Sequence, residues 1–180
     1  MSVEDFNSEV LEGEHCPFCN KKTLTLRQAE REVPFFGNLI IFSMDCENED
    51  CGYHKADVEA SESKGPVKAS FEVTCEEDLK VRVVKSSSAT IKIAHVGSIE
   101  PGEASNGYVT NIEGILNRMK VQVEKIRDNT DDDSEKKKAK NIIKKLTKVM
   151  MGSEKIKITL DDPTGNSAII SEKTEFKNGK

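Results

Sequence analysis

The arrangement of its cysteines most constrains how this chain can fold. Cys16 and Cys19 are separated by two residues, Cys46 and Cys51 by four, and 26 residues lie between the two pairs. A pair at such a spacing places two thiolates on one tight turn, and two such turns complete the tetrahedral coordination of one zinc ion. We therefore predict that these four residues bind a single structural Zn²⁺. Because four thiolates close the coordination sphere, such a site holds structure and does not activate water.

Alternative ligands and alternative chemistry remain open at this cluster. The four-residue spacing is a looser turn, so His15, Asp45, Asp50 or, first among them, His54 could substitute for a cysteine. Disulfides are disfavoured, because an odd number of cysteines without an export signal indicates a reducing, cytoplasmic setting. A thioredoxin-like role would need a surrounding βαβ pattern, which is not evident. Cys75 lies outside the cluster, on a strand-like stretch, and is expected to be an ordinary buried or half-buried apolar residue.

The residues around the cysteines predict a small β-structured finger. Its expected elements are a strand (23–33), a turn (34–37), a second strand (39–44), a returning strand (53–59) and a linker or turn (61–66). Residues 1–13 are acidic and without periodicity, so we expect an irregular lead-in. The finger is accordingly assigned to residues 14–62.

Beyond the linker, the pattern is that of an antiparallel β domain interrupted by two helices. Apolar and polar residues alternate in five segments: 67–74, 79–83, 91–93, 156–160 and 168–170. Apolar residues recur at helical spacing over 112–126 and 139–150, with a capping box at 110–113 and an acidic turn at 129–133. We predict a β domain over 63–175, an inserted helical hairpin over 111–151 and a tail over 176–180.

The charge of the chain limits its partners. Lys+Arg 27 against Asp+Glu 32 gives a net charge of -5, which disfavours general duplex binding. No run of 18 apolar residues is present, so no membrane span is expected. The second helix nevertheless carries seven lysines, at positions 136, 137, 138, 140, 144, 145 and 148. We favour a solvated face, and the alternative is a docking surface for an acidic partner or RNA.

Several separated motifs together resemble the ZPR-type zinc-finger proteins. In the finger they are Cys16-Pro17-Phe18-Cys19 and the segments 31–37, 41–44 and 51–53. In the second domain they are the segments 78–86, 100–102, 107–116 and 161–167, the last reading Asp-Asp-Pro-Thr-Gly-Asn-Ser. The resemblance runs with gaps from about residue 16 to residue 171. It departs at Cys46 and Cys51, because the family's second pair is usually separated by two residues.

This resemblance implies a four-cysteine zinc finger followed by a β-barrel of the double-stranded β-helix type that carries a helical hairpin. The chain has room for one such module, the form found in archaea. Eukaryotic relatives bind translation elongation factor one-alpha and assist its folding, and they also bind receptor tyrosine kinases. The implied function is therefore a non-enzymatic, zinc-binding folding or assembly factor whose protein partner is the elongation factor.

Two aromatic residues are the candidate partner-binding side chains. Phe35 and Phe36 lie in the predicted turn of the finger hairpin, where exposed apolar groups would suit partner recognition. They could instead pack on the second domain. The alternative function is a zinc-ribbon protein that binds nucleic acid or the ribosome through the lysine-rich helix. An enzyme is least favoured, because His95 is the only histidine left for the second domain.

Overall fold

The computed structural model describes residues 8–34, 36–62 and 65–176 of the 180-residue chain. The strands in this part are β1 (Ser8–His15), β2 (Lys22–Val33), β3 (Gly37–Cys46), β4 (His54–Ala60), β5 (Val67–Val73), β6 (Arg82–Lys85), β7 (Thr90–Ile93), β8 (Gly97–Ile99), β9 (Tyr108–Asn111), β10 (Ile156–Asp162), β11 (Ala168–Ile170) and β12 (Glu175–Phe176). The helices are a short 3₁₀ helix, η1 (Glu76–Lys80), and two α-helices, α1 (Ile112–Asn129) and α2 (Asp133–Met150).

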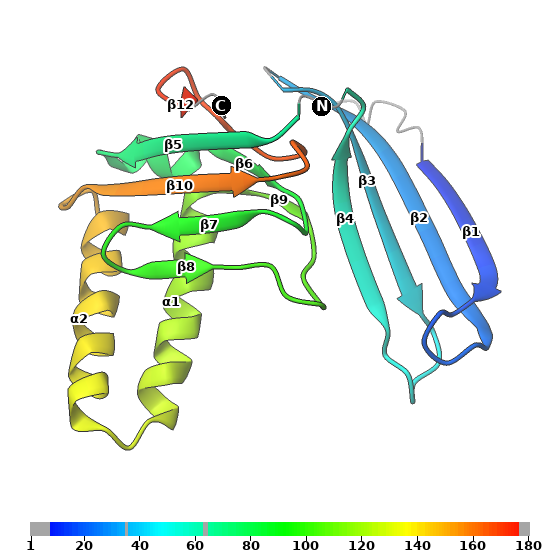
Figure 1. The fold of residues 1–180 in the computed structure, drawn as a ribbon, viewed down its shortest axis with the longest axis horizontal. Helices are drawn as coiled ribbons and strands as arrows, with labels where there is room; N and C mark the ends of the chain where they lie inside the picture. Colours follow the sequence, from blue (N-terminus) through cyan, green and yellow to red (C-terminus); the bar gives the residue numbers. More distant parts are fainter. Residues whose placement is uncertain (1–7, 35, 63–64, 177–180) are drawn as a thin grey trace.

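The N-terminal part is one antiparallel sheet in the order β1-β2-β3-β4 (Figure 1). The predicted hairpin and returning strand are confirmed as β2, β3 and β4. The prediction of an irregular lead-in is wrong for residues 8–13, because Ser8–His15 pairs with β2 as an edge strand. Every residue of β1 is exposed, so no buried face produces an alternating pattern in its sequence.

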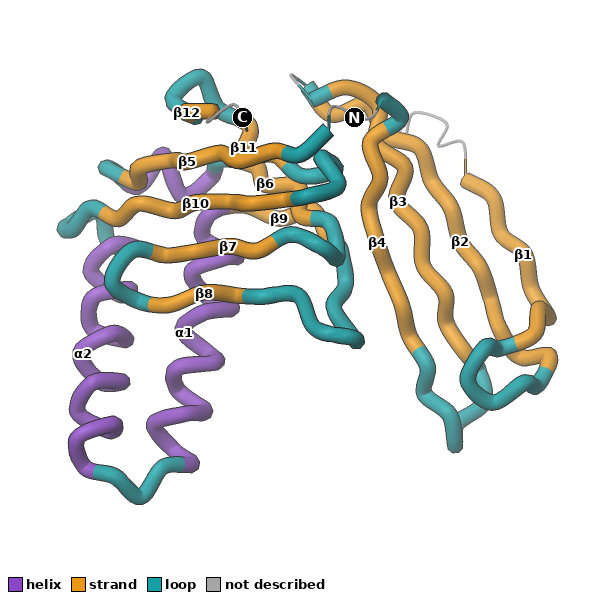
Figure 2. The backbone as a smooth tube through the Cα atoms, in the orientation of Figure 1, coloured by secondary structure: helices purple, strands orange, loops and turns teal. Residues whose placement is uncertain are grey.

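The second domain is mainly β, with the helical hairpin against its sheets (Figure 2). One sheet has the order β12-β5-β10-β7-β8 and the other the order β11-β6-β9. The predicted mainly antiparallel β domain is confirmed, but its sheets form a sandwich-like arrangement and do not close into a barrel. A single core joins Phe71 and Ile158 of the larger sheet, Ile169 of the smaller sheet, and Leu116 and Leu146 of the helices.

Two local predictions differ from the structure. The segment 79–83 was expected to be one strand, but Leu79 lies in η1 and the strand begins at Arg82. The predicted capping box began at Thr110, whereas the observed N-cap is Asn111, whose Oδ1 accepts a hydrogen bond from the Gly114 N–H at 2.8 Å. Both differences are local shifts, and the elements themselves stay in the predicted order.

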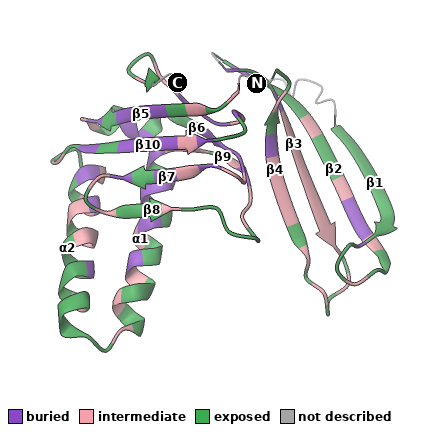
Figure 3. Ribbon diagram, in the orientation of Figure 1, coloured by how far each residue is buried: buried purple, intermediate pink, exposed green. Residues whose placement is uncertain are grey.

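The helical hairpin presents its apolar stripe to the sheets and its charges to solvent (Figure 3). Helix α2 begins at Asp133, earlier than the apolar stripe suggested, because the Asp132 side chain accepts hydrogen bonds from the N–H groups of Ser134 and Glu135. Five of its seven lysines are exposed and two are half-buried, in agreement with a solvated face. Within the described residues, neither helix is long and apolar enough to cross a membrane.

Strand β4 forms the junction between the two domains. Its outer edge is satisfied by side chains of the second domain, since Asn106 Oδ1 accepts from the Ala56 N–H at 3.0 Å and Asn166 Oδ1 from the Ala60 N–H at 3.1 Å. Capping an edge strand in this way removes donors that could otherwise pair with another chain. A small apolar cluster also crosses the junction, with members Val33, Phe36, Leu39, Val58, Val84 and Ala168.

Gly165 packs closely against the linker that joins the two domains. Its φ is +79°, and a Cβ atom built there would lie 2.1 Å from the backbone oxygen of Gly65. We expect Gly165→Ala to lower the free energy of unfolding by roughly 2–4 kcal/mol, because left-handed strain and a backbone clash add. Chemical denaturation measures this change. Gly102→Ala is the matched control, since no atom lies within 4 Å of its added Cβ, and equal losses in both variants would contradict the account.

Candidate metal centre

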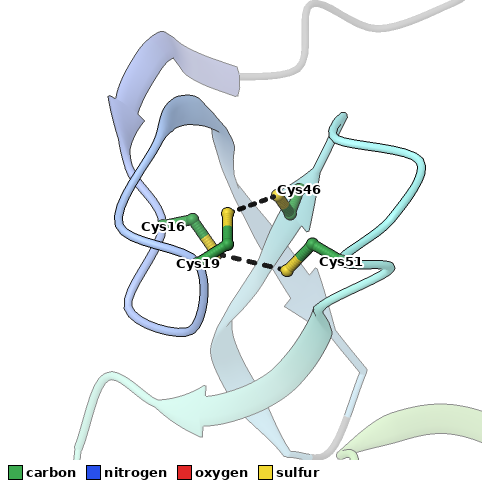
Figure 4. Close-up of side chains that lie close together, drawn as sticks. All are labelled: Cys16, Cys19, Cys46 and Cys51. Atoms are coloured by element: carbon green, nitrogen blue, oxygen red, sulfur yellow. Dashed lines mark hydrogen bonds between the residues drawn. The ribbon is translucent and has the colours of Figure 1, made fainter.

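The four predicted cysteines converge at one end of the finger sheet (Figure 4). Their sulfur atoms all lie within 4.8 Å of one another. The Sγ atoms of Cys16 and Cys51 are 3.8 Å apart, as are those of Cys19 and Cys46. Four thiolates placed tetrahedrally at about 2.3 Å from one zinc ion lie about 3.8 Å from each other. The donor set and its spacing therefore fit one zinc ion.

Two tight turns bring these sulfurs together. Cys16 and Cys19 lie in the turn between β1 and β2, where the Asn20 N–H donates to the Cys16 carbonyl at 2.8 Å and Asn20 is left-handed at φ 56°. Cys46 ends β3, and Cys51 lies in the turn before β4. The longer second turn closes through the Cys51 N–H, which donates to the Asn48 carbonyl at 2.9 Å. The longer loop between Cys46 and Cys51 therefore still places the Cys51 sulfur within the cluster.

Neighbouring donors face the sulfur atoms. The Phe18 N–H donates to Cys16 Sγ at 3.4 Å, and the Thr23 hydroxyl lies 3.3 Å from Cys46 Sγ. Such neighbouring donors orient the sulfur atoms toward the centre of the cluster. Cys16 is completely buried, which shields the centre from solvent.

The thiols of Cys19 and Cys51 have pKa values shifted in opposite directions when no metal neutralises them. The backbone N–H of Lys21 is the main cause that lowers the pKa of Cys19 to about 6, and hydrogen bonds with the other three cysteines add to it. The backbone contact with Tyr53 lowers the pKa of Cys51, but burial and the three neighbouring sulfurs raise it to about 12. A divalent cation removes this conflict, since it stabilises all four thiolates together.

The substitute ligands considered from the sequence lie outside this cluster. His54 Nδ1 is 2.6 Å from Asp45 Oδ1, so these two residues pair with each other. His15 Nδ1 lies 3.2 Å from the Asn20 carbonyl. Among the described residues, the only group that could hold a metal consists of the four cysteines, and it does not include Asp50.

The two predicted partner-binding phenylalanines are not both testable in the structure. Phe36 is 8% exposed and belongs to the apolar cluster that contains Val84 and Ala168 of the second domain. Of the two alternatives for Phe36, packing on the second domain is the one observed, and its side chain is not available to a partner. Phe35 lies outside the described residues.

A different phenylalanine is exposed beside the metal centre. Phe18 lies between two cysteines, is 80% exposed and stacks on Tyr53 with ring centroids 6.1 Å apart. We call this pair the aromatic rim. The sequence contained a signal for it, since Phe18 directly precedes Cys19 and Tyr53 follows Cys51 by two residues. A residue between two ligands on a tight turn has little room to fold inward.

The finger sheet has a small apolar core of its own. Near the cysteines, Leu24 is the buried aliphatic residue, while β1 is exposed throughout and most of β3 is half-buried. Sheets with so little buried apolar surface depend on another source of stability. A four-thiolate zinc ion supplies it, since structural zinc contributes about 10–16 kcal/mol of apparent binding energy to small fingers at neutral pH.

The fold and the site together define a protein in which a four-cysteine zinc finger is joined to a jelly-roll domain. Comparison with protein families agrees with this class: the ZPR1 zinc-finger domain matches residues 9–64 and the ZPR1 jelly-roll domain matches residues 77–179. The chain belongs to the ZPR1 zinc-finger family.

Relatives are found in archaea and in eukaryotes. An uncharacterized ZPR1-like protein of Methanocaldococcus jannaschii is 36% identical over 89% of this chain and 81% of its own length. One of Pyrococcus horikoshii is also 36% identical, over 90% of this chain and 74% of its own. The zinc finger chaperone zpr1 of Schizosaccharomyces pombe is 32% identical over 86% of this chain, which spans only 33% of that protein.

Proposed function

We propose that this protein is a non-enzymatic, zinc-dependent binding protein of the cytoplasm that recognises translation elongation factor one-alpha and assists its folding or assembly. The support is threefold. The metal centre has four protein ligands and thus leaves no position for a substrate. A relative carries the name zinc finger chaperone. The sequence resembles a family whose eukaryotic members bind this elongation factor.

The observation that carries the proposal is the exposed aromatic rim. Large aromatic side chains dominate the energetics of protein interfaces, and the Phe18 ring is 80% exposed and thus available to a partner. The zinc turn fixes the Phe18 backbone, and stacking on Tyr53 restricts its ring. A rigid anchor loses little conformational entropy when a partner binds, which favours affinity.

Truncating Phe18 tests the proposal at the level of binding. We expect immobilised, zinc-loaded protein to retain the elongation factor from cell extract and Phe18→Ala to weaken this binding about 30-fold, as for the loss of a central aromatic anchor. Phe176→Ala is the matched control, because Phe176 is 61% exposed on the second domain. Failure of the wild-type protein to retain the elongation factor would count against the partner. If both variants weakened binding equally, the aromatic rim would not be the binding site.

Binding of nucleic acid is the second candidate function, favoured by one observation. Lys137, Lys138, Lys140, Lys144 and Lys148 are exposed on α2, and none of them forms an ion pair with a described residue. No aromatic residue accompanies them on the helix to stack on bases. Electrostatic binding is strongest at low salt concentration. If the protein binds no RNA at low salt, this function is excluded.

A further inference from the structure

A cavity of the second domain lies away from the metal centre and has no part in the proposed function. It is about 630 Å³ in volume and is lined mainly by residues of the β8–β9 segment and of α1. Its lining includes two cations, one aromatic ring and two aliphatic side chains: Lys85, Arg118, Tyr108, Ile99 and Val121. These residues come from four different elements and from no part of the zinc finger.

Lys85 is an unusual residue to find at such a place. It is 2% exposed, and burial lowers its pKa because an ammonium group is poorly solvated in the interior. Its Nζ donates one hydrogen bond, to the Ser86 carbonyl at 2.9 Å, although an ammonium group can donate three. Within the described residues, no carboxylate lies within ion-pair distance of it.

The two carboxylates whose charges act on Lys85 are engaged by other donors. Asp57 accepts hydrogen bonds from the backbone N–H groups of Val58 and Ser87 and from the Ser87 hydroxyl. Asp162 accepts from Ser86, Ser167 and Thr164. Their charges favour the protonated form of Lys85 from a distance, but neither oxygen pair contacts its ammonium group. The buried charge is therefore held in place and only partly satisfied.

A second cation reaches the same ring. The guanidinium carbon of Arg118 lies 4.2 Å from the centroid of the Tyr108 ring, and Lys85 Nζ lies 5.6 Å from it. Arg118 forms no ion pair among the described residues, and its positive charge further lowers the pKa of Lys85. Both cations thus lie over one ring, and neither has a carboxylate at ion-pair distance among the described residues, so an anion that contacted both would stabilise both.

The remaining lining indicates the kind of anion. Ile99 is half-buried, and Val121 is 47% exposed on α1. These side chains offer an apolar wall beside the two cations. We propose that the cavity binds a small organic anion whose carboxylate or phosphate group contacts Lys85 and Arg118 and whose apolar portion contacts Ile99 and Val121.

The test is a titration of the zinc-loaded protein followed by two-dimensional amide NMR. The probes are N-acetylleucine, inorganic phosphate and, as the uncharged match of the first, N-acetylleucinamide. We expect millimolar N-acetylleucine or phosphate to shift the amides of Lys85, Tyr108 and Arg118, and the amide analogue to shift none. Response to one anion and not the other identifies a carboxylate or a phosphate ligand. No shift with either anion, or equal shifts with the uncharged analogue, overturns the proposal.

Two variants separate this cavity from general surface charge. Arg118→Gln should weaken binding of the effective anion about tenfold, because it removes a charge-assisted contact at an exposed residue on which the core does not depend. Lys125→Gln makes the same change of charge on an exposed position of α1 outside the lining and should leave binding unchanged. Equal loss in both variants would overturn the cavity as the site.

Discussion

Cys16→Ser is expected to reduce bound zinc well below one ion per chain and to unfold the finger sheet. A serine hydroxyl remains protonated at neutral pH and is a poor zinc ligand. The variant therefore has three sulfur ligands for the zinc ion in place of the four in the wild-type cluster. The finger then loses most of the roughly 10–16 kcal/mol that structural zinc supplies to such domains. Elemental analysis measures the zinc, and amide NMR reports on the β1–β4 sheet.

Cys75→Ser provides the matched control for this change. Cys75 is half-buried at the N-terminus of η1 and lies outside the cysteine cluster. The same substitution there should leave one zinc ion per chain and an intact finger. Full zinc retention in Cys16→Ser would contradict the four-sulfur assignment. Equal zinc loss in Cys75→Ser would show that the effect is not specific to the cluster.

Asp162→Asn is expected to destabilise the second domain by about 3 kcal/mol, which lowers the melting temperature by roughly 6–12 °C. Asp162 is completely buried at the end of β10 and accepts hydrogen bonds from Ser86 and Thr164 at 2.7–2.9 Å and from Ser167. An amide presents one acceptor oxygen in place of two and turns its NH₂ group toward existing donors. Thermal denaturation measures the loss.

The neighbouring residue supplies the control. Asp161 is 41% exposed and pairs with Lys68 at 2.8 Å on the surface. Asp161→Asn should change stability by no more than about 1 kcal/mol, as is usual for a surface ion pair. Equal stability of the two variants would contradict the inference that the buried, hydrogen-bonded Asp162 carboxylate stabilises the domain.

The Asp162 carboxylate should also make the stability of the second domain depend on pH. Burial alone would raise the pKa of Asp162. Hydrogen bonds from Ser167, Thr164 and Ser86 lower it by more than burial raises it, so the folded-state pKa is below the usual value. Its contribution to stability is then fully present above the unfolded pKa of about 4 and is lost as pH falls through the folded-state pKa. Asp162→Asn should therefore be closer in stability to the wild-type protein under acid conditions than at neutral pH.

The sequence predicted those elements whose two faces differ in burial. Strand β5 alternates because Ala69, Phe71 and Val73 enter the core, and the helices show a clear stripe for the same reason. Strand β1 has no buried face, and β8 and β12 have only three and two residues, so periodicity could not reveal them. Closure of the sheets depends on pairings between distant strands, which explains why a barrel was expected where two sheets are observed.

The residues of the candidate site also differ in how far the sequence alone could predict them. The four metal ligands were predictable because short spacing along the chain fixes their geometry almost by itself. Which phenylalanine is exposed was not, because Phe36 is covered by Val84 and Ala168, residues far away in the sequence. The buried Lys85 was equally invisible, since its burial results from the packing of β6 against β9 and β11.

The central claim is that the zinc finger binds a protein partner, and calorimetric titration with purified translation elongation factor one-alpha tests it most directly. The account predicts saturable binding by the zinc-loaded protein and loss of binding once a chelator has removed the metal, because the aromatic rim is positioned by the zinc turn. Absence of binding by the zinc-loaded protein, or equal affinity of the zinc-free protein, would contradict it.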